Sequence, residues 1–116
     1  MKLSRAKQIL KNYSQLFIKA YLFGSTVTGN QDEYSDIDLI LVRETPLDFF
    51  DRIREVMKLV LELGRVDIMI YTPLELEDVL NSDGREFIKS AVSGGILIAG
   101  TQRRGSKMAK AGRKRS

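Results

Sequence analysis

Two carboxylates stand one residue apart where an apolar run begins. Asp36 and Asp38 flank Ile37, and the run continues to Val42. Such a run predicts a buried strand, in which residues i and i+2 point to the same face about 6–7 Å apart. Two like charges there repel each other, and burial raises the cost of each. Because no Lys or Arg lies between Gln31 and Val42, positive charge must come from elsewhere, and Mg²⁺ is a cation that prefers carboxylate oxygens.

A Gly-Ser pair precedes these acids. Gly24 and Ser25 follow a short apolar segment, residues 20–23, that is typical of a strand. Glycine allows a sharp turn or a close backbone approach, and a strand, a Gly-Ser turn and a following helix start together suit a phosphate group. The alternative is an ordinary turn in which Ser25 caps a helix.

A third carboxylate lies downstream. Asp67 is near the start of another apolar segment, residues 66–71, which predicts a further strand. An acid in a neighbouring strand would complete a two-cation site or accept the proton of a nucleophile. The alternative is a strand-end aspartate paired with Arg65 or another cation.

Gly24-Ser25, ten intervening residues, Asp36-x-Asp38 and the later Asp67 together resemble the minimal nucleotidyltransferases of the DNA polymerase beta superfamily. The resemblance covers residues 1–100. It implies an α/β (α+β) nucleotidyltransferase fold, with a small mixed β-sheet flanked by helices. It also implies two Mg²⁺ ions at the three aspartates, ATP at Gly24 and Ser25, and transfer of AMP with release of pyrophosphate.

The resemblance implies a partner as well, because small members of this superfamily act as antitoxins of HEPN-domain toxins and some adenylylate a toxin tyrosine. We therefore expect Asp36, Asp38 and Asp67 to be catalytic and the acceptor to be a toxin tyrosine. The chain departs from the pattern at Thr26 and Thr28, where many relatives carry arginines. That departure favours an alternative, a weak or inactive antitoxin that neutralises its toxin by complex formation, whereas the intact acids favour the enzyme.

Composition restricts the remaining possibilities. A chain of 116 residues with 43% hydrophobic and 29% charged residues is typical of one globular domain. The absence of cysteine and histidine excludes disulfides, thiolate metal sites and Ser-His or Cys-His nucleophiles. No apolar run is long enough for a membrane span and no secretory signal is evident, so we expect a cytoplasmic protein.

The net charge of +4 is unevenly distributed. Residues 101–116 hold seven basic residues and no acids, which leaves 12 basic and 15 acidic residues in 1–100. We expect a nucleotidyltransferase domain over 1–100 and a basic, flexible tail over 101–116. Such a tail would contact nucleic acid weakly through charge or simply aid solubility. The pattern leaves the oligomeric state open, a homo-oligomer included.

Periodicity predicts four helices and four strands. Thr45 and Pro46 suit the start of a long helix, whose Met and Phe residues we assign to the core, and Thr72 with Glu75 suits a capping box. Phe87 and Ile88 are expected to face inward from a later helix. The expected helices cover 3–17, 46–63, 73–80 and 84–93, and the expected strands cover 19–23, 36–42, 66–71 and 95–99.

Overall fold

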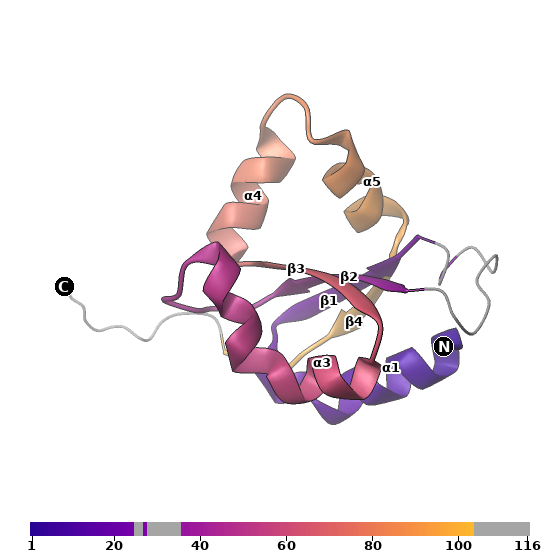
Figure 1. Ribbon diagram of the computed structural model, residues 1–116. Coiled ribbons are helices and arrows are strands. Elements are labelled where there is room, and N and C mark those ends of the chain that lie inside the picture. The colour runs from indigo at the N-terminus through magenta and orange to yellow at the C-terminus, as the bar shows by residue number, and fades with distance from the viewer. Residues whose placement is uncertain (25–26, 28–35, 104–116) are drawn as a thin grey trace.

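The computed structural model describes residues 1–24, 27 and 36–103, so Ser25, Thr26 and Thr28 lie outside the described residues. The helices and strands follow the predicted order along the chain, although the helix expected over 3–17 ends at Asn12 and a short 3₁₀ segment follows it (Figure 1). Their order is α1 (Leu3–Asn12), η1 (Ser14–Leu16), β1 (Lys19–Phe23), β2 (Ile37–Val42), η2 (Phe49–Val56), α3 (Met57–Leu63), β3 (Val66–Tyr71), α4 (Pro73–Asn81), α5 (Glu86–Gly94) and β4 (Ile96–Ala99).

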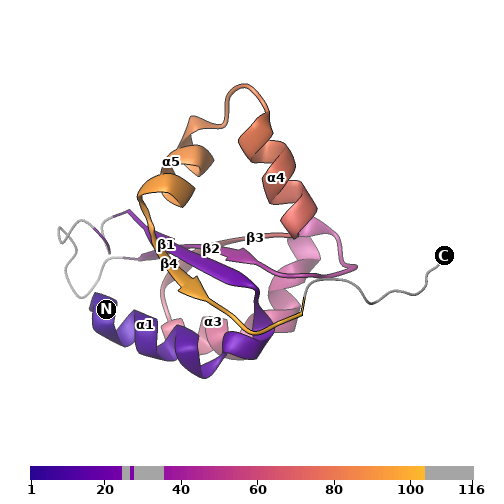
Figure 2. The ribbon, with the colours of Figure 1, turned by 180° about the vertical axis from the view of Figure 1, so that it is seen from behind.

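The four strands form one mixed sheet in the order β3-β2-β1-β4. β2 pairs with β3 in parallel, whereas β1 is antiparallel to both β2 and β4. α1 and α3 cover one face of the sheet, and α4 and α5 stand over the other, as both views show (Figures 1 and 2). The predicted fold class, a small mixed sheet flanked by helices, is confirmed.

Strand β2 separates two hydrophobic clusters because its side chains alternate between the faces. Ile37, Leu39 and Leu41 pack in the cluster that includes the buried residues of α1 and α3. Ile40 and Val42 pack in the other cluster, with buried residues of α4 and α5. Alternation therefore places the Asp38 side chain on the α4/α5 face, at the end of β2 that lies farthest from Val42.

The predicted helix over 46–63 is wrong at its start. Residues 43–48 are not helical, and a 3₁₀ segment, η2, precedes the α-helix that begins at Met57. Instead of capping a helix, the Thr45 hydroxyl accepts a hydrogen bond from Leu47 N and donates one to Glu55. The assignment of the Phe and Met side chains to the core is also wrong, since Phe50 is 90% exposed.

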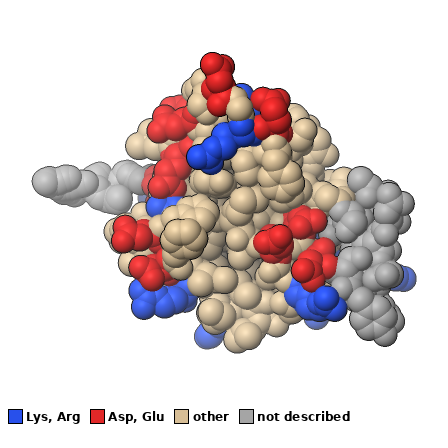
Figure 3. Space-filling view, turned by 45° about the horizontal axis from the view of Figure 1, so that its top comes forward, with Lys and Arg blue, Asp and Glu red and all other residues tan. Residues whose placement is uncertain are grey.

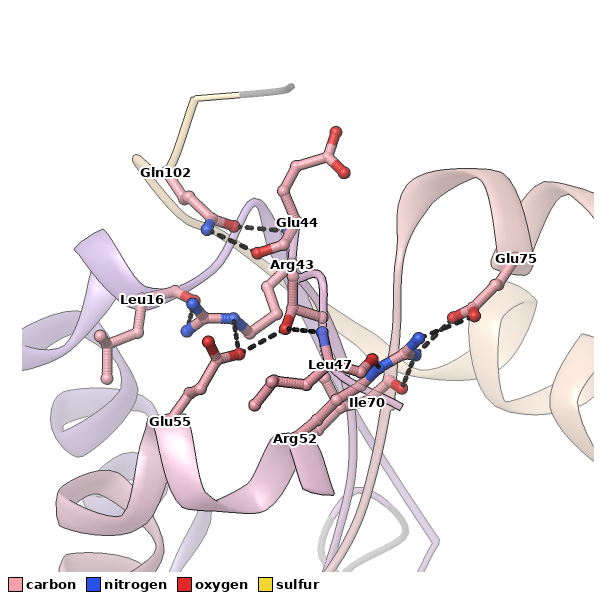
Figure 4. Close-up of polar contacts among 10 residues, drawn as sticks. Leu16, Arg43, Glu44, Leu47, Arg52, Glu55, Ile70, Glu75 and Gln102 are labelled. Carbon is pink, nitrogen blue, oxygen red and sulfur yellow. Dashed lines mark hydrogen bonds and ion pairs between the residues drawn. The ribbon is translucent and has the colours of Figure 1, made fainter. Parts of the chain in front are cut away.

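A buried arginine explains this irregular segment. Arg52 is 5% exposed and donates to Leu47 O at 2.9 Å and to Ile70 O at 3.0 Å. Its guanidinium also holds Glu75 through two hydrogen bonds, one of them 2.8 Å long (Figure 4). Because all these acceptors lie close to the end of β3, η2 is fixed against that end of the sheet.

Glu75 has a second role, as the predicted capping box shows. It accepts from Thr72 N at 2.9 Å, and the Thr72 hydroxyl accepts from Glu75 N at 3.2 Å. The Arg52 guanidinium, followed by the Thr72 backbone N–H, lowers the pKa of Glu75 from 4.5 to about 2, against the opposing effect of burial. The same carboxylate therefore begins α4 and joins it to η2.

The chain stays attached to the domain beyond β4. Gly100 N donates to Ile18 O, Thr101 N to Ser14 O, and Gln102 N to Phe17 O. The Gln102 side chain also exchanges two hydrogen bonds with the Glu44 backbone. The boundary between a domain over 1–100 and a basic tail stays a prediction. Within the described ranges, every helix is too short or too polar to cross a membrane.

We expect Glu75→Gln to lower the free energy of unfolding by about 1 kcal/mol near neutral pH, because a partly exposed ion pair contributes little more. Folding depresses the pKa of Glu75 from 4.5 to about 2, so its contribution is complete above pH 4.5 and is lost as the pH falls toward 2. Urea denaturation across this range should show the wild type losing its advantage over the variant. Glu77→Gln, on the same helix, is the control, and parallel curves for wild type and Glu75→Gln would contradict the assignment.

Candidate functional site

Two of the predicted acids lie side by side in the sheet. Asp38 and Asp67 are register partners in the parallel pair β2–β3, and Phe23 is the register partner of Asp38 in the antiparallel pair β1–β2. Neighbouring strands lie about 4.8 Å apart, and register partners direct their side chains to the same face. One end of the sheet therefore presents Asp67, Asp38 and Phe23 in a row, on a face that carries several acidic side chains (Figure 3).

Asp36 lies just before β2 and is paired. Its carboxylate accepts a hydrogen bond from Arg65 Nε at 3.1 Å, and both side chains are more than half exposed. The Arg65 carbonyl also accepts from Ile37 N, which joins the starts of β2 and β3. Arg65 thus supplies the positive charge that the sequence around Asp36 lacks. The alternative in which Arg65 pairs with Asp67 is not the arrangement found.

Asp38 is affected electrostatically by its surroundings and by the other two acids. The pKa of Asp38 is raised above its ordinary value, first by burial and then by the negative charges of Asp67 and Asp36. Carboxylate oxygens in this setting suit a hard divalent cation, whose charge would offset the repulsion. Among the described residues, however, no three acids converge on one point where a metal ion would be held. Asp38 and Asp67 are register partners, whereas Asp36 is held by Arg65.

Gly24 ends β1 against Asp38. Its φ of +72° is a conformation that L side chains rarely adopt. A Cβ built at this position would overlap the Asp38 carboxylate. Glycine is therefore required twice, for the backbone turn and for the space beside Asp38. The predicted phosphate-binding partner of Gly24, Ser25, lies outside the described residues.

An aromatic residue near the acids was not anticipated. Phe87 was expected to face the core, but it is 63% exposed. Its ring stands edge-on to that of Phe23, with ring centroids 5.4 Å apart and an interplanar angle of 77°. The local sequence contains a signal for this, because Phe87, Ser90, Ala91 and Gly94 share the spacing of one helix face, and all but the first are small.

We expect Gly24→Ala to destabilise the protein by about 1–2 kcal/mol more than Gly64→Ala. Both glycines have a positive φ, but a Cβ at Gly64 meets nothing within 4 Å, whereas one at Gly24 meets Asp38. Comparing the unfolding free energies of the two variants isolates the contact from the backbone strain. Equal losses would show that Asp38 does not depend on the space beside Gly24.

Asp67→Asn should lower the pKa of Asp38 toward its ordinary value of 3.8. The variant removes the negative charge of Asp67, which raises this pKa more than the charge of Asp36 does. The pKa should stay above 3.8, since burial is the first cause of the shift and is unchanged. Carboxyl-carbon NMR titration of labelled aspartate measures this directly. Asp83→Asn, in the turn between α4 and α5, is the control, and an unchanged Asp38 titration in Asp67→Asn would refute the coupling.

Known proteins resemble this chain to different extents. A Haemophilus influenzae protein named probable protein adenylyltransferase MntA is 42% identical over 52 residues, which is 40% of this chain and 46% of that protein. The aligned part thus spans less than half of the relative's length. A crystal structure from Sulfolobus solfataricus, assigned as a nucleotidyltransferase, has a TM-score of 0.50 and 27% identity over 66% of this chain and 71% of its own.

A second solved structure is a toxin-antitoxin crystal structure with AMP-PNP. It has a TM-score of 0.53 and 25% identity, and covers 88% of this chain and 76% of its own. Residues 4–104 match the family model described as polymerase beta, nucleotidyltransferase, which includes the described acids, Gly24 and every strand of the sheet. Because this match extends over most of the sequence, the chain belongs to the polymerase beta nucleotidyltransferase family.

Proposed function

We propose that this chain is a magnesium-dependent nucleotidyltransferase that transfers AMP from ATP to a protein acceptor and so acts as an antitoxin. The observation that carries the proposal is the register pairing of Asp38 with Asp67 beside Gly24. Two relatives support its direction, one named as a protein adenylyltransferase and one a toxin-antitoxin structure with an ATP analogue. The proposed acceptor is a tyrosine hydroxyl of a HEPN-domain toxin, as the resemblance implies.

The proposed role of each residue follows from its position in the sheet. Asp36, Asp38 and Asp67 would hold the divalent ions, which when bound supply positive charge against the α-phosphate. Gly24, together with Ser25, allows the phosphates to approach the backbone closely. Asp67 is exposed on the edge strand β3, where an incoming acceptor hydroxyl can reach a carboxylate.

The proposed reaction needs only ATP, the acceptor hydroxyl and a carboxylate that takes up the proton. The acceptor oxygen bonds to the α-phosphorus of ATP while the bond from that phosphorus to the bridging oxygen breaks. The electron pair leaves on pyrophosphate, and the acceptor proton passes to Asp67. The carboxylates repel the nucleotide unless cations intervene, so nucleotide binding should depend on the metal.

A second candidate function is a binding antitoxin that neutralises its toxin by covering it. One observation favours it: Asp36 is engaged by Arg65, so the three acids are not gathered in the present arrangement. Thr26 and Thr28, in place of basic residues, also weaken the argument for a tightly held triphosphate. The two candidates share the same fold and partner and differ only in chemistry.

The remaining parts of the proposal concern the setting. We place the reaction in the cytoplasm, with ATP and the toxin as partners and residues 1–100 as the catalytic unit. The basic residues 101–116 would add weak, salt-sensitive contact with nucleic acid. A homo-oligomer is compatible with this proposal and is not required by it.

Label transfer from α-³²P-ATP tests the chemistry. With Mg²⁺ and a purified HEPN-domain toxin, we expect label on the toxin, reduced at least about a hundredfold in Asp38→Asn. Asp83→Asn, an exposed acid in the α4–α5 turn, should transfer label normally. A stable complex without label, in which Asp38→Asn still neutralises the toxin, would refute the enzyme and establish the binding antitoxin.

A further inference from the structure

A small hollow lies directly beside the candidate acids. Its volume is about 180 Å³, and it lies where the end of β1 meets one face of α5. None of its described lining residues is charged, although they adjoin an acidic site. The lining consists of Phe23, Gly24, Val27, Phe87, Ser90, Ala91 and Gly94.

The α5 wall of this hollow is formed by one large and three small residues. Phe87, Ser90, Ala91 and Gly94 have the i, i+3, i+4, i+7 spacing of one helix face. The face thus has a large ring at one end and only small residues after it. Phe87 is 63% exposed and its ring is supported edge-on by Phe23, so its own face remains available. An exposed aromatic ring beside a small neutral hollow suits a flat, uncharged ring system.

The hollow lies at the inner end of the row of acids, next to β1, whereas the proposed acceptor approaches the outer end, at the edge strand β3. Register pairing sets Asp67, Asp38 and Phe23 in a row from the sheet edge inward. The acceptor needs the outer end of this row, since Asp67 is on the edge strand. Gly24 touches the Asp38 position and also lines the hollow, so a ligand with its phosphates at the acids would extend its other end into it.

We infer that this hollow receives the nucleobase of the donor nucleotide, with Phe87 stacking on it. The inference rests on the proposed nucleotidyltransferase function and adds a base-binding residue to it. A volume of about 180 Å³ is below the range of sites that enclose a whole ligand, so it suits the base and leaves the ribose and phosphates outside. Stacking on an aromatic side chain is available to every base, so Phe87 sets affinity for a base rather than the choice among bases.

Calorimetric titration with two probes separates the base from the phosphates. The full chain is titrated with ATP and with inorganic tripolyphosphate, each with Mg²⁺. Phe87→Ala should weaken ATP binding by about five- to a hundredfold and leave tripolyphosphate binding unchanged. Phe50→Ala is the matched control, because this phenylalanine is 90% exposed on η2 and lies outside the hollow; it should change neither affinity.

A second variant tests the space itself. Gly94 lines the hollow, and a Cβ there meets nothing within 4 Å, so α5 should accept Gly94→Leu. The added side chain should fill the hollow and weaken ATP binding, again without affecting tripolyphosphate. Phe87→Tyr, which keeps the ring, should retain the wild-type affinity for ATP.

The outcomes distinguish the inference from the proposed function. Equal loss of both probes in Phe87→Ala, or no loss of either, would overturn the inference and leave the transferase intact. Unchanged ATP affinity with a raised KM for the toxin would assign the hollow to an aromatic side chain of the partner instead. If the wild type binds neither probe, the proposed function itself fails, and the inference fails with it.

Discussion

The candidate site depends on one constraint, the register of the parallel pair β2–β3. That register places Asp38 beside Asp67, and the burial of Ile37, Leu39 and Leu41 on the opposite face fixes which way Asp38 points. A slip of one residue would turn the acids to the other face and bring core residues out of the cluster. The hydrophobic core therefore holds two like charges together in spite of their repulsion.

Carboxylates at the two ends of β3 have opposite electrostatic environments. Near the end of β3, Arg52 bonds Ile70 O and Glu75, and the pKa of Glu75 falls to about 2. At its start, Asp38 is partly buried beside Asp67, and the pKa of Asp38 rises. The first arrangement satisfies its charges internally and stabilises the fold. The second leaves a deficit of positive charge, which is the pattern expected of a site that binds a cation or a cation-bound ligand.

Features that depend on local sequence patterns were predictable. Each strand and the Thr72–Glu75 capping box follow from apolar runs and cap spacing, and the structure agrees. The assignment of Asp36, Asp38 and Asp67 to one site stays a prediction. Side chains whose place depends on distant partners were not predictable in this way. Arg52 reads as a solvated charge until β3 and α4 supply its acceptors, and the pairing of Arg65 with Asp36 joins residues 29 apart. Phenylalanine is usually a core residue, and only the small residues on the same helix face indicate that Phe87 is exposed.

The Arg65–Asp36 pair is a weak argument against chemistry at this site. Its two side chains are 68% and 55% exposed, and pairs of this kind contribute no more than about 1 kcal/mol. A divalent ion at Asp38 and Asp67 would attract the Asp36 carboxylate more strongly than one exposed guanidinium does, because its charge is double and its ligands are held by the sheet. Release of Asp36 would then leave Arg65 just before β3, close to Asp67, the acid that we propose faces the acceptor. The pairing is thus compatible with an enzyme whose third acid joins the other two only when its ligands arrive.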